Sequence, residues 1–244
     1  MTPSSAPRER PRLLLFDVFG TLADWRTGIA GELQSTLGAL GITADAWALA
    51  DAWRAQYQPS MEVVRSGHMP YAKLDLLHRQ NLDHVLHQWG LGAQVPEAAR
   101  QHLNQAWHRL PAWPDVGAGL QALRPLAQLA PCSNGHLALM ANLARHNGWH
   151  WDAVVGAEWA RDYKPQPGVY LAAAAAFDLR PEQAMMVAAH SSDLAAAAAC
   201  GLQTAFVARP DEYGPGTGEA QAASPVELSC GSLLELAQRL RDWV

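Results

Sequence analysis

Short apolar runs alternate with helical patterns along much of the chain. Six runs have the composition of buried β-strands, and they cover residues 13–17, 126–133, 153–156, 184–189, 204–208 and 226–229. Apolar residues repeat with helical spacing over residues 137–146, 167–177, 193–200 and 233–244. Strands that alternate with helices of about 10 to 15 residues are typical of a parallel sheet covered on both faces. The pattern therefore predicts a doubly wound α/β core.

The long interval at residues 22–111 has no comparable strand signal. It contains amphipathic helical patterns such as residues 45–65 and 71–89, and it predicts an all-helical cap inserted after the first strand. The core is then formed by residues 1–21 and 112–244. Such a cap lies at the carboxyl ends of the strands, where open parallel sheets bind their ligands. Residues 211–225 are rich in Gly, Pro, Ser and acids, which predicts a mobile loop.

Composition narrows the class of protein. The formal net charge of −5 argues against a nucleic-acid partner, because phosphate backbones are held chiefly by clustered cations. No apolar run approaches the roughly 20 residues of a membrane span, and the polar start, MTPSSAPRERPR, does not read as a secretory signal. The three cysteines are far apart and form no C-x-x-C pair. We expect a cytoplasmic protein that acts on a small solute, and a homodimer is left open.

Polar side chains follow several of the predicted strands. Asp17 ends the first strand, and Gly20 then allows a tight turn. Later strand ends carry Ser133 with Asn134, then Lys164, and finally His190 with Asp193. Each alone is an ordinary turn or helix start. Four such groups in order on one α/β frame predict a single site.

These groups form a recognisable set of motifs. D-x-x-G-T at residues 17–21, S-N-G at 133–135, K-P at 164–165 and the last strand-end acid resemble the haloacid dehalogenase superfamily over nearly the whole chain. The helical interval resembles the cap of that superfamily, and the subgroup that looks closest is the L-2-haloacid dehalogenases. The resemblance implies that Asp17 is the nucleophile, and the subgroup's other motif positions are met by Thr21, Arg54, Ser133, Asn134, Lys164, Tyr170 and Asp193.

Two acids of the superfamily's phosphatases are absent. Phe19 stands where their second acid would be, and Ala189 stands at the position of a magnesium-binding acid. Crowded carboxylates need a hard cation, whereas one or two can be balanced by Lys164 and Arg54. We therefore expect no metal and no cofactor at this site. An aromatic side chain beside the nucleophile suits an apolar carbon that carries a halogen.

The implied reaction is displacement of halide from carbon 2 of a short haloacid by Asp17, with inversion, followed by hydrolysis of the ester. Lys164 keeps Asp17 ionised, and Arg54 receives the halide. Ser133 and Asn134, with nearby backbone N–H groups, hold the substrate carboxylate. Asp193 pairs with Lys164 and helps to activate the hydrolytic water.

The last motif departs from the subgroup, which often has S-S-N-x-W-D where this chain has AAHSSD at residues 188–193. His190 replaces an amide, so the water activator is either His190 or Asp193, and the size of the substrate is left open. Two alternatives also stay open. One is another hydrolase of the superfamily, a weak phosphatase or a phosphonatase that would need Lys73 for a Schiff base, and the other is a degenerate binding protein.

Overall fold

A computed structural model describes residues 9–243 of the chain. Its centre is a parallel sheet of six strands with the order β3-β2-β1-β4-β5-β6. The strands are β1 (Leu13–Phe16), β2 (Gln128–Ser133), β3 (Val155–Gly156), β4 (Ala184–Ala188), β5 (Gln203–Val207) and β6 (Leu228–Cys230). The order reverses direction at β1, which pairs with β2 on one side and β4 on the other. This switch point creates a crevice at the carboxyl end of β1.

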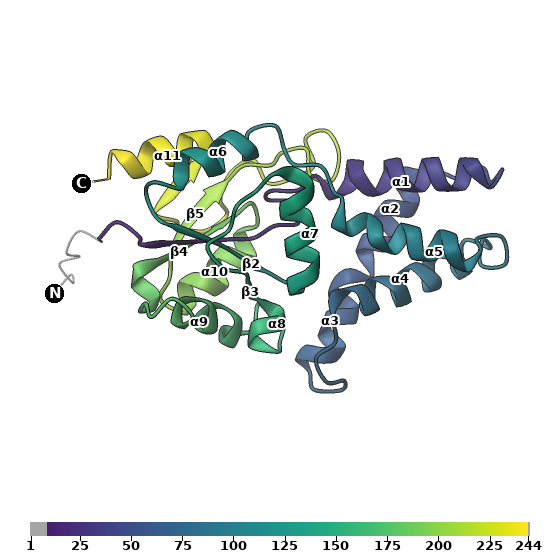
Figure 1. The fold of residues 1–244 in the computed structure, drawn as a ribbon, viewed down its shortest axis with the longest axis horizontal. Helices are drawn as coiled ribbons and strands as arrows, with labels where there is room; N and C mark the ends of the chain where they lie inside the picture. Colours follow the sequence, from purple (N-terminus) through teal and green to yellow (C-terminus); the bar gives the residue numbers. More distant parts are fainter. Residues whose placement is uncertain (1–8, 244) are drawn as a thin grey trace.

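Helices cover both faces of the sheet (Figure 1). They are α6 (Val116–Leu123), α7 (Leu137–Asn147), α8 (Ala157–Ala160), α9 (Pro167–Ala175), α10 (Ser191–Ala199) and α11 (Leu233–Arg241), with a short 3₁₀ helix, η2 (Pro181–Gln183). Leu14 and Phe16 of β1 pack into the same apolar cluster as residues of α6, α7 and α11, whereas Leu13 and Leu15 face α9 and α10. Because β1 is apolar on both faces, it is suited to the middle of this layered core.

The remaining helices gather beside the sheet, on the side toward which β1 runs (Figure 1). They are α1 (Trp25–Ala39), α2 (Ala46–Ala55), α3 (Tyr57–Arg65), α4 (Leu74–Gln88), α5 (Glu97–Asn104) and the 3₁₀ helix η1 (Gln105–His108). Asp24 begins α1 by accepting a hydrogen bond from the Thr27 N–H at 3.1 Å. Residues 22–111 contain helices and no strand.

The predicted fold class, a doubly wound α/β core with helices inserted after the first strand, is confirmed. One predicted helix is wrong in its length, because residues 45–65 form two helices, α2 and α3. Pro59 explains the break, since it has no N–H to donate to the Ala55 carbonyl. Residues 1–8, including most of the polar start, and Val244 of the predicted last helix lie outside the described part of the chain.

Candidate active site

Asp17 lies directly after the central strand β1, and the end of the sheet surrounds its carboxylate with donors. Its Oδ1 accepts a hydrogen bond from Lys164 Nζ at 2.9 Å. Its Oδ2 accepts from the Thr21 hydroxyl at 2.7 Å and lies 3.1 Å from His190 Nδ1. The carboxylate is almost fully buried, with 7% of the residue exposed. Asp17 is therefore a rigidly held anion at the switch point of the sheet.

Lys164 links Asp17 to a second buried acid. Its ammonium also lies 2.5 Å from Asp193 Oδ2, and the other oxygen of Asp193 accepts a hydrogen bond from the Tyr170 hydroxyl at 2.5 Å. The backbone N–H of Lys164 donates to Asn134 Oδ1 at 2.8 Å, so the S-N-G turn after β2 helps to fix the lysine. Each oxygen of Asp193 thus has a partner.

His190 bridges Asp17 to an acid that the sequence did not indicate. Its Nε2 lies 2.8 Å from Glu212 Oε2, and Glu212 Oε1 accepts a hydrogen bond from Trp25 Nε1 at 3.0 Å. Glu212 is 1% exposed although it belongs to the Gly- and Pro-rich segment at residues 211–225. The Glu212 carboxylate also lies against Gly20, where an added Cβ would be 2.1 Å from Oε1. Asp17, His190 and Glu212 form one hydrogen-bonded line.

The charged side chains in this group keep one another ionised. Burial opposes ionisation of Asp17, but the ammonium of Lys164 and the hydrogen bond from His190 hold the pKa of Asp17 far below its ordinary value. Burial also disfavours the charged lysine, and the two neighbouring carboxylates nevertheless raise the pKa of Lys164. For His190, burial is again outweighed, and hydrogen bonds with Asp17 and Glu212 raise its pKa to about 10. At neutral pH the site holds ionised Asp17 beside two cations.

A pocket of about 610 Å³ opens above Asp17. The sheet side contributes Asp17, Phe19, Asn134, Lys164, Pro165, Gln166, His190, Ser192, Asp193 and Tyr213, and helices α2 and α3 contribute Arg54, Tyr57, Gln58, Glu62 and Arg65. The guanidinium of Arg54 lies 4.0 Å from the centre of the Tyr57 ring, and its Nη1 is buried without a hydrogen-bond partner among the described residues. The pocket therefore has an apolar wall and an unsatisfied cation opposite the sheet.

Seven of the ten site residues predicted from the sequence line this pocket, and the other three do not line it but lie next to residues that do. The three are fully buried: Thr21, Ser133 and Tyr170. The Thr21 hydroxyl accepts a hydrogen bond from the Ala189 N–H at 2.9 Å, and the Ser133 hydroxyl accepts from the Gly135 N–H at 3.0 Å. Phe19 packs edge-on against Trp107 at 5.8 Å between ring centres. The sequence did not indicate Glu212, nor the lining residues Gln58, Glu62, Arg65, Gln166 and Tyr213, because no motif marks them.

The donor set around Asp17 does not fit a magnesium ion. The positions at which phosphatases of this architecture supply further acids hold Phe19 and Ala189. The two carboxylates that remain, Asp17 and Asp193, both contact the Lys164 ammonium, which occupies the place between them. A hard divalent cation needs several free oxygen ligands, and these two acids do not offer them.

Comparisons with known proteins agree with this geometry. Residues 11–201 match the family model of haloacid dehalogenase-like hydrolases. The chain is 29% identical to (S)-2-haloacid dehalogenase 1 of Pseudomonas sp. (strain CBS-3) over 235 residues, which are 94% of this chain and 96% of that protein. The crystal structure of the L-2-haloacid dehalogenase PA0810 is 45% identical, with a TM-score of 0.91 and coverage of 95% of this chain and 99% of that one.

A second crystal structure, of the defluorinating L-2-haloacid dehalogenase Rha0230, is 41% identical, with a TM-score of 0.92 and 95% coverage of both chains. No helix in residues 9–243 is both long and apolar enough to cross a membrane. The strand order and the side-chain cluster at the end of β1 agree with the family match, which covers most of the chain. The protein therefore belongs to the haloacid dehalogenase-like hydrolase family.

Proposed function

We propose that this chain is a hydrolytic (S)-2-haloacid dehalogenase, which converts a short 2-haloacid and water into a 2-hydroxyacid and halide. The observation that carries the proposal is the presence in one pocket of an ionised, buried Asp17 and of Arg54, whose Nη1 has no hydrogen-bond partner within residues 9–243. A carboxylate nucleophile and a separate anion site are what displacement of halide from carbon requires. The names of relatives that cover nearly the whole chain support the same reaction.

Asp17 attacks carbon 2 of the substrate in the first step. A new carbon–oxygen bond forms to the carboxylate, the carbon–halogen bond breaks with its electron pair, and carbon 2 is inverted. Arg54 accepts the departing halide, because its Nη1 has no other partner among the residues that the structure describes. Burial favours this step, since a carboxylate without a water shell is a stronger nucleophile.

The substrate carboxylate needs its own anchor, and Asn134 is suited to that role. Its Oδ1 accepts the Lys164 N–H, which leaves the amide NH₂ as a donor, and the residue lines the pocket. Ser133 acts from behind, because its hydroxyl is buried and holds the Gly135 N–H. Phe19 and Tyr57 form the apolar surface against which the alkyl part of the substrate lies.

The second step hydrolyses the ester, and we assign the base to His190. Asp193 is less suited, because its oxygens are occupied by Lys164 and Tyr170. In the resting site His190 is an imidazolium held by Asp17 and Glu212. Once Asp17 is an ester it has lost its charge, so the pKa of His190 falls and one proton leaves to solvent. Neutral His190 then takes one proton from the attacking water, and the other proton of that water passes to the departing oxygen of the 2-hydroxyacid. Cleavage of the ester thus restores ionised Asp17 and the imidazolium.

We infer that residues 22–111 act as a cap over a core formed by residues 1–21 and 112–244. Five of the residues that line the pocket come from that interval: Arg54, Tyr57, Gln58, Glu62 and Arg65. In the reaction the cap supplies the halide site and excludes water, while the core supplies the nucleophile. No step of this mechanism uses a metal ion.

A single turnover in oxygen-18 water, with enzyme in excess over (S)-2-chloropropionate, tests this proposal. Direct attack by Asp17 predicts unlabelled (R)-lactate and oxygen-18 in the peptide that contains Asp17, because water enters only at the acyl carbon of the ester. Label mainly in the product would make water the nucleophile and overturn the covalent route. Absence of halide release from every short 2-haloacid would overturn the function itself.

A further inference from the structure

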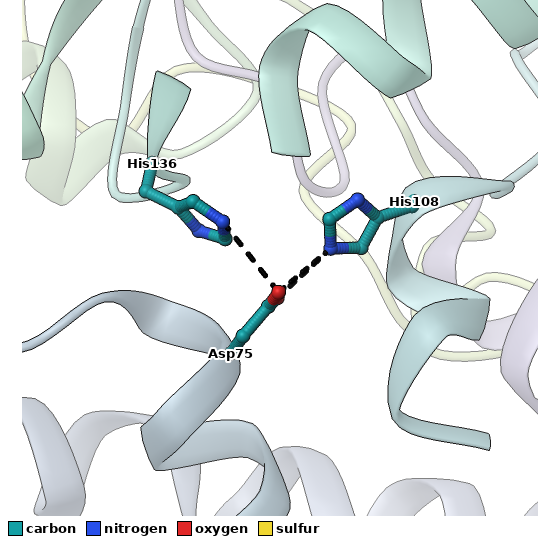
Figure 2. A group of neighbouring side chains, drawn as sticks. All are labelled: Asp75, His108 and His136. Carbon is teal, nitrogen blue, oxygen red and sulfur yellow. Dashed lines mark hydrogen bonds and ion pairs between the residues drawn. The ribbon is translucent and has the colours of Figure 1, made fainter. Parts of the chain in front are cut away.

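A second cluster of titratable side chains lies where helix α4 meets the core (Figure 2). Asp75 comes from the first turn of α4, His108 ends η1, and His136 precedes α7. His108 Nε2 lies 2.9 Å from Asp75 Oδ1, and His136 Nε2 lies 3.5 Å from Asp75 Oδ2. None of the three residues lines the pocket above Asp17. Two imidazoles and a carboxylate from separate segments thus converge on one point.

The protein alone satisfies this cluster poorly. His136 is 2% exposed, and its Nε2, the ring nitrogen that faces Asp75, lies 3.5 Å from Oδ2, which is longer than a good hydrogen bond. A buried imidazole without good hydrogen-bond partners is unusual in a plain ion pair.

We propose that Asp75, His108 and His136 bind one divalent transition-metal ion of the Zn²⁺ class. Their ligand atoms all lie within 4.8 Å of one another. Four-coordinate Zn²⁺ with ligand distances of about 2.1 Å places neighbouring ligand atoms about 3.4 Å apart. Asp75 Oδ2 already lies 3.0 Å from His108 Nε2 and 3.5 Å from His136 Nε2, so only the two imidazoles need to approach each other. Two nitrogens and one carboxylate oxygen, completed by a water, are a common ligand set for this ion.

Two further features favour an ion at this place. The Asp75 side chain is 25% exposed, which gives an ion a route from solvent to the buried histidines. The other ring nitrogen of His108 lies 2.9 Å from the side-chain amide of Asn142. With the amide oxygen turned toward the ring, Asn142 would accept the Nδ1 proton and direct Nε2 to the metal, as outer partners of metal-bound histidines do.

The ion would fasten α4 to the core. His136 follows the S-N-G turn, and Asn134 of that turn holds the backbone of Lys164. Close by, the Tyr163 hydroxyl donates to the Ala72 carbonyl at 2.7 Å, so this is already a point where the helices and the sheet side are joined. The role is structural, because the cluster contributes no group to the pocket, and it does not depend on the proposed function.

Titration of the full chain with Co²⁺, after dialysis against a chelator, tests the proposal. Wild type should bind one equivalent with the strong visible bands of a four-coordinate ion, and Zn²⁺ should displace it. Removal of an outer partner weakens such sites by about 10- to 100-fold, so His136→Ala should weaken binding by more than about 100-fold. The matched control is His84→Ala with His87→Ala, which removes two exposed histidines from the same helix α4 and should leave binding intact.

Thermal unfolding gives a second readout that does not depend on activity. Zn²⁺ should raise the melting midpoint of wild type and of the control, but not that of Asp75→Asn, which keeps the shape of the side chain. Asp75→Asn also carries the test if His136→Ala does not fold. The proposal is overturned if wild type binds no stoichiometric ion at micromolar concentration, or if both site variants bind as wild type does.

Discussion

A buried carboxylate ordinarily prefers the neutral form, because burial removes the water that stabilises its charge. Asp17 stays ionised since Lys164 and His190 both donate to it. The sequence allowed the first of these partners to be predicted, because K-P is a motif with a fixed place after the first strand-end acid. It did not allow Glu212 to be predicted, because nothing within its loop sequence shows that this acid folds back against Gly20 and His190.

The role of Arg54 depends on the shape of its guanidinium as well as its charge. The guanidinium carbon lies over the Tyr57 ring, 4.0 Å from its centre, and Arg54 lines the pocket. An ammonium cannot stack in this way, so Arg54→Lys should stay folded and lose about 100-fold or more in kcat/KM. Arg79→Lys, which changes an ion pair among α4 and α5 residues, is the control and should stay near wild type. Near-native turnover of Arg54→Lys would remove Arg54 from the site.

Glu212 should control the second chemical step and not the first. In Glu212→Gln the imidazolium of His190 loses one of its two carboxylate partners, so the charged form is less stable when the ring takes a proton from water. We expect ester hydrolysis to slow by about 100-fold while the halide burst persists. Asp211→Asn, an exposed neighbour in the same loop, should behave as wild type.

Measurement of the ester by mass spectrometry after rapid quenching distinguishes the two steps. The covalent adduct on Asp17 should accumulate in Glu212→Gln, and its decay should speed up as pH rises because hydrolysis requires neutral His190. Equal slowing of the burst and of the decay would show that Glu212 only supports the fold. Decay that is independent of pH would remove His190 as the base.

At the level of elements, the parallel sheet was predictable because each core strand is a short apolar run between turn residues. The strand candidates lie within about two residues of the observed ones. The interruption of the helix at Gln56 was not predicted, because the amphipathic pattern continues through Pro59. The segment at residues 211–225 has no helix or strand, as expected, but Glu212 and Glu219 anchor it to His190 and Ser191. Such contacts depend on the tertiary fold and leave no periodic signal.

The turn that joins β1 to α1 gives a prediction at this scale. Gly20 has φ of +87°, and a Cβ there would collide with the Glu212 carboxylate. Gly20→Ala should therefore destabilise the fold by about 1 to 3 kcal/mol and displace Glu212. Gly31→Ala is the matched control, because an added Cβ on α1 meets nothing within 4 Å, and it should stabilise by about 0.5 to 1 kcal/mol. Urea unfolding compares the two, and equal stability would contradict the expected strain.

At the level of the whole molecule, the pocket exists only because the helices of residues 22–111 lie against the end of the sheet. Arg65 of α3 donates to the Lys164 carbonyl at 2.8 Å, and Lys73 pairs with Glu158 at 3.3 Å. These contacts join residues that are 99 and 85 positions apart in the sequence, and no motif predicted them. Seven of the residues that line the pocket were predictable from motifs, whereas the way in which the helices of residues 22–111 and the sheet side enclose the pocket required the structure.

The shifted pKa values of Asp17 and His190 should also make the free energy of unfolding depend on pH. The folded pKa of His190 is about 10, above its ordinary value of 6.5, so its contribution is fully present below pH 6.5 and is lost as pH rises to about 10. Asp17 acts in the opposite sense, because its folded pKa is depressed and its contribution is lost as pH falls below its ordinary value of 3.8. For these two groups, stability is greatest between about pH 4 and pH 6.5.

The variant Glu212→Gln isolates the contribution of His190 to the pH dependence of stability. One proton changes the free energy of unfolding by at most about 1.4 kcal/mol per pH unit. With one carboxylate partner gone, the pKa of His190 in the folded variant is lower than in the folded wild type. The free energy of unfolding of wild type should therefore exceed that of the variant most at pH 6.5. Urea unfolding should show that this difference shrinks steadily toward pH 10, while Asp211→Asn follows wild type throughout. A difference in unfolding free energy that stays constant across this range would mean that His190 is not protonated in the folded protein. The proposed base of ester hydrolysis would then lack the loss of a proton that activates it.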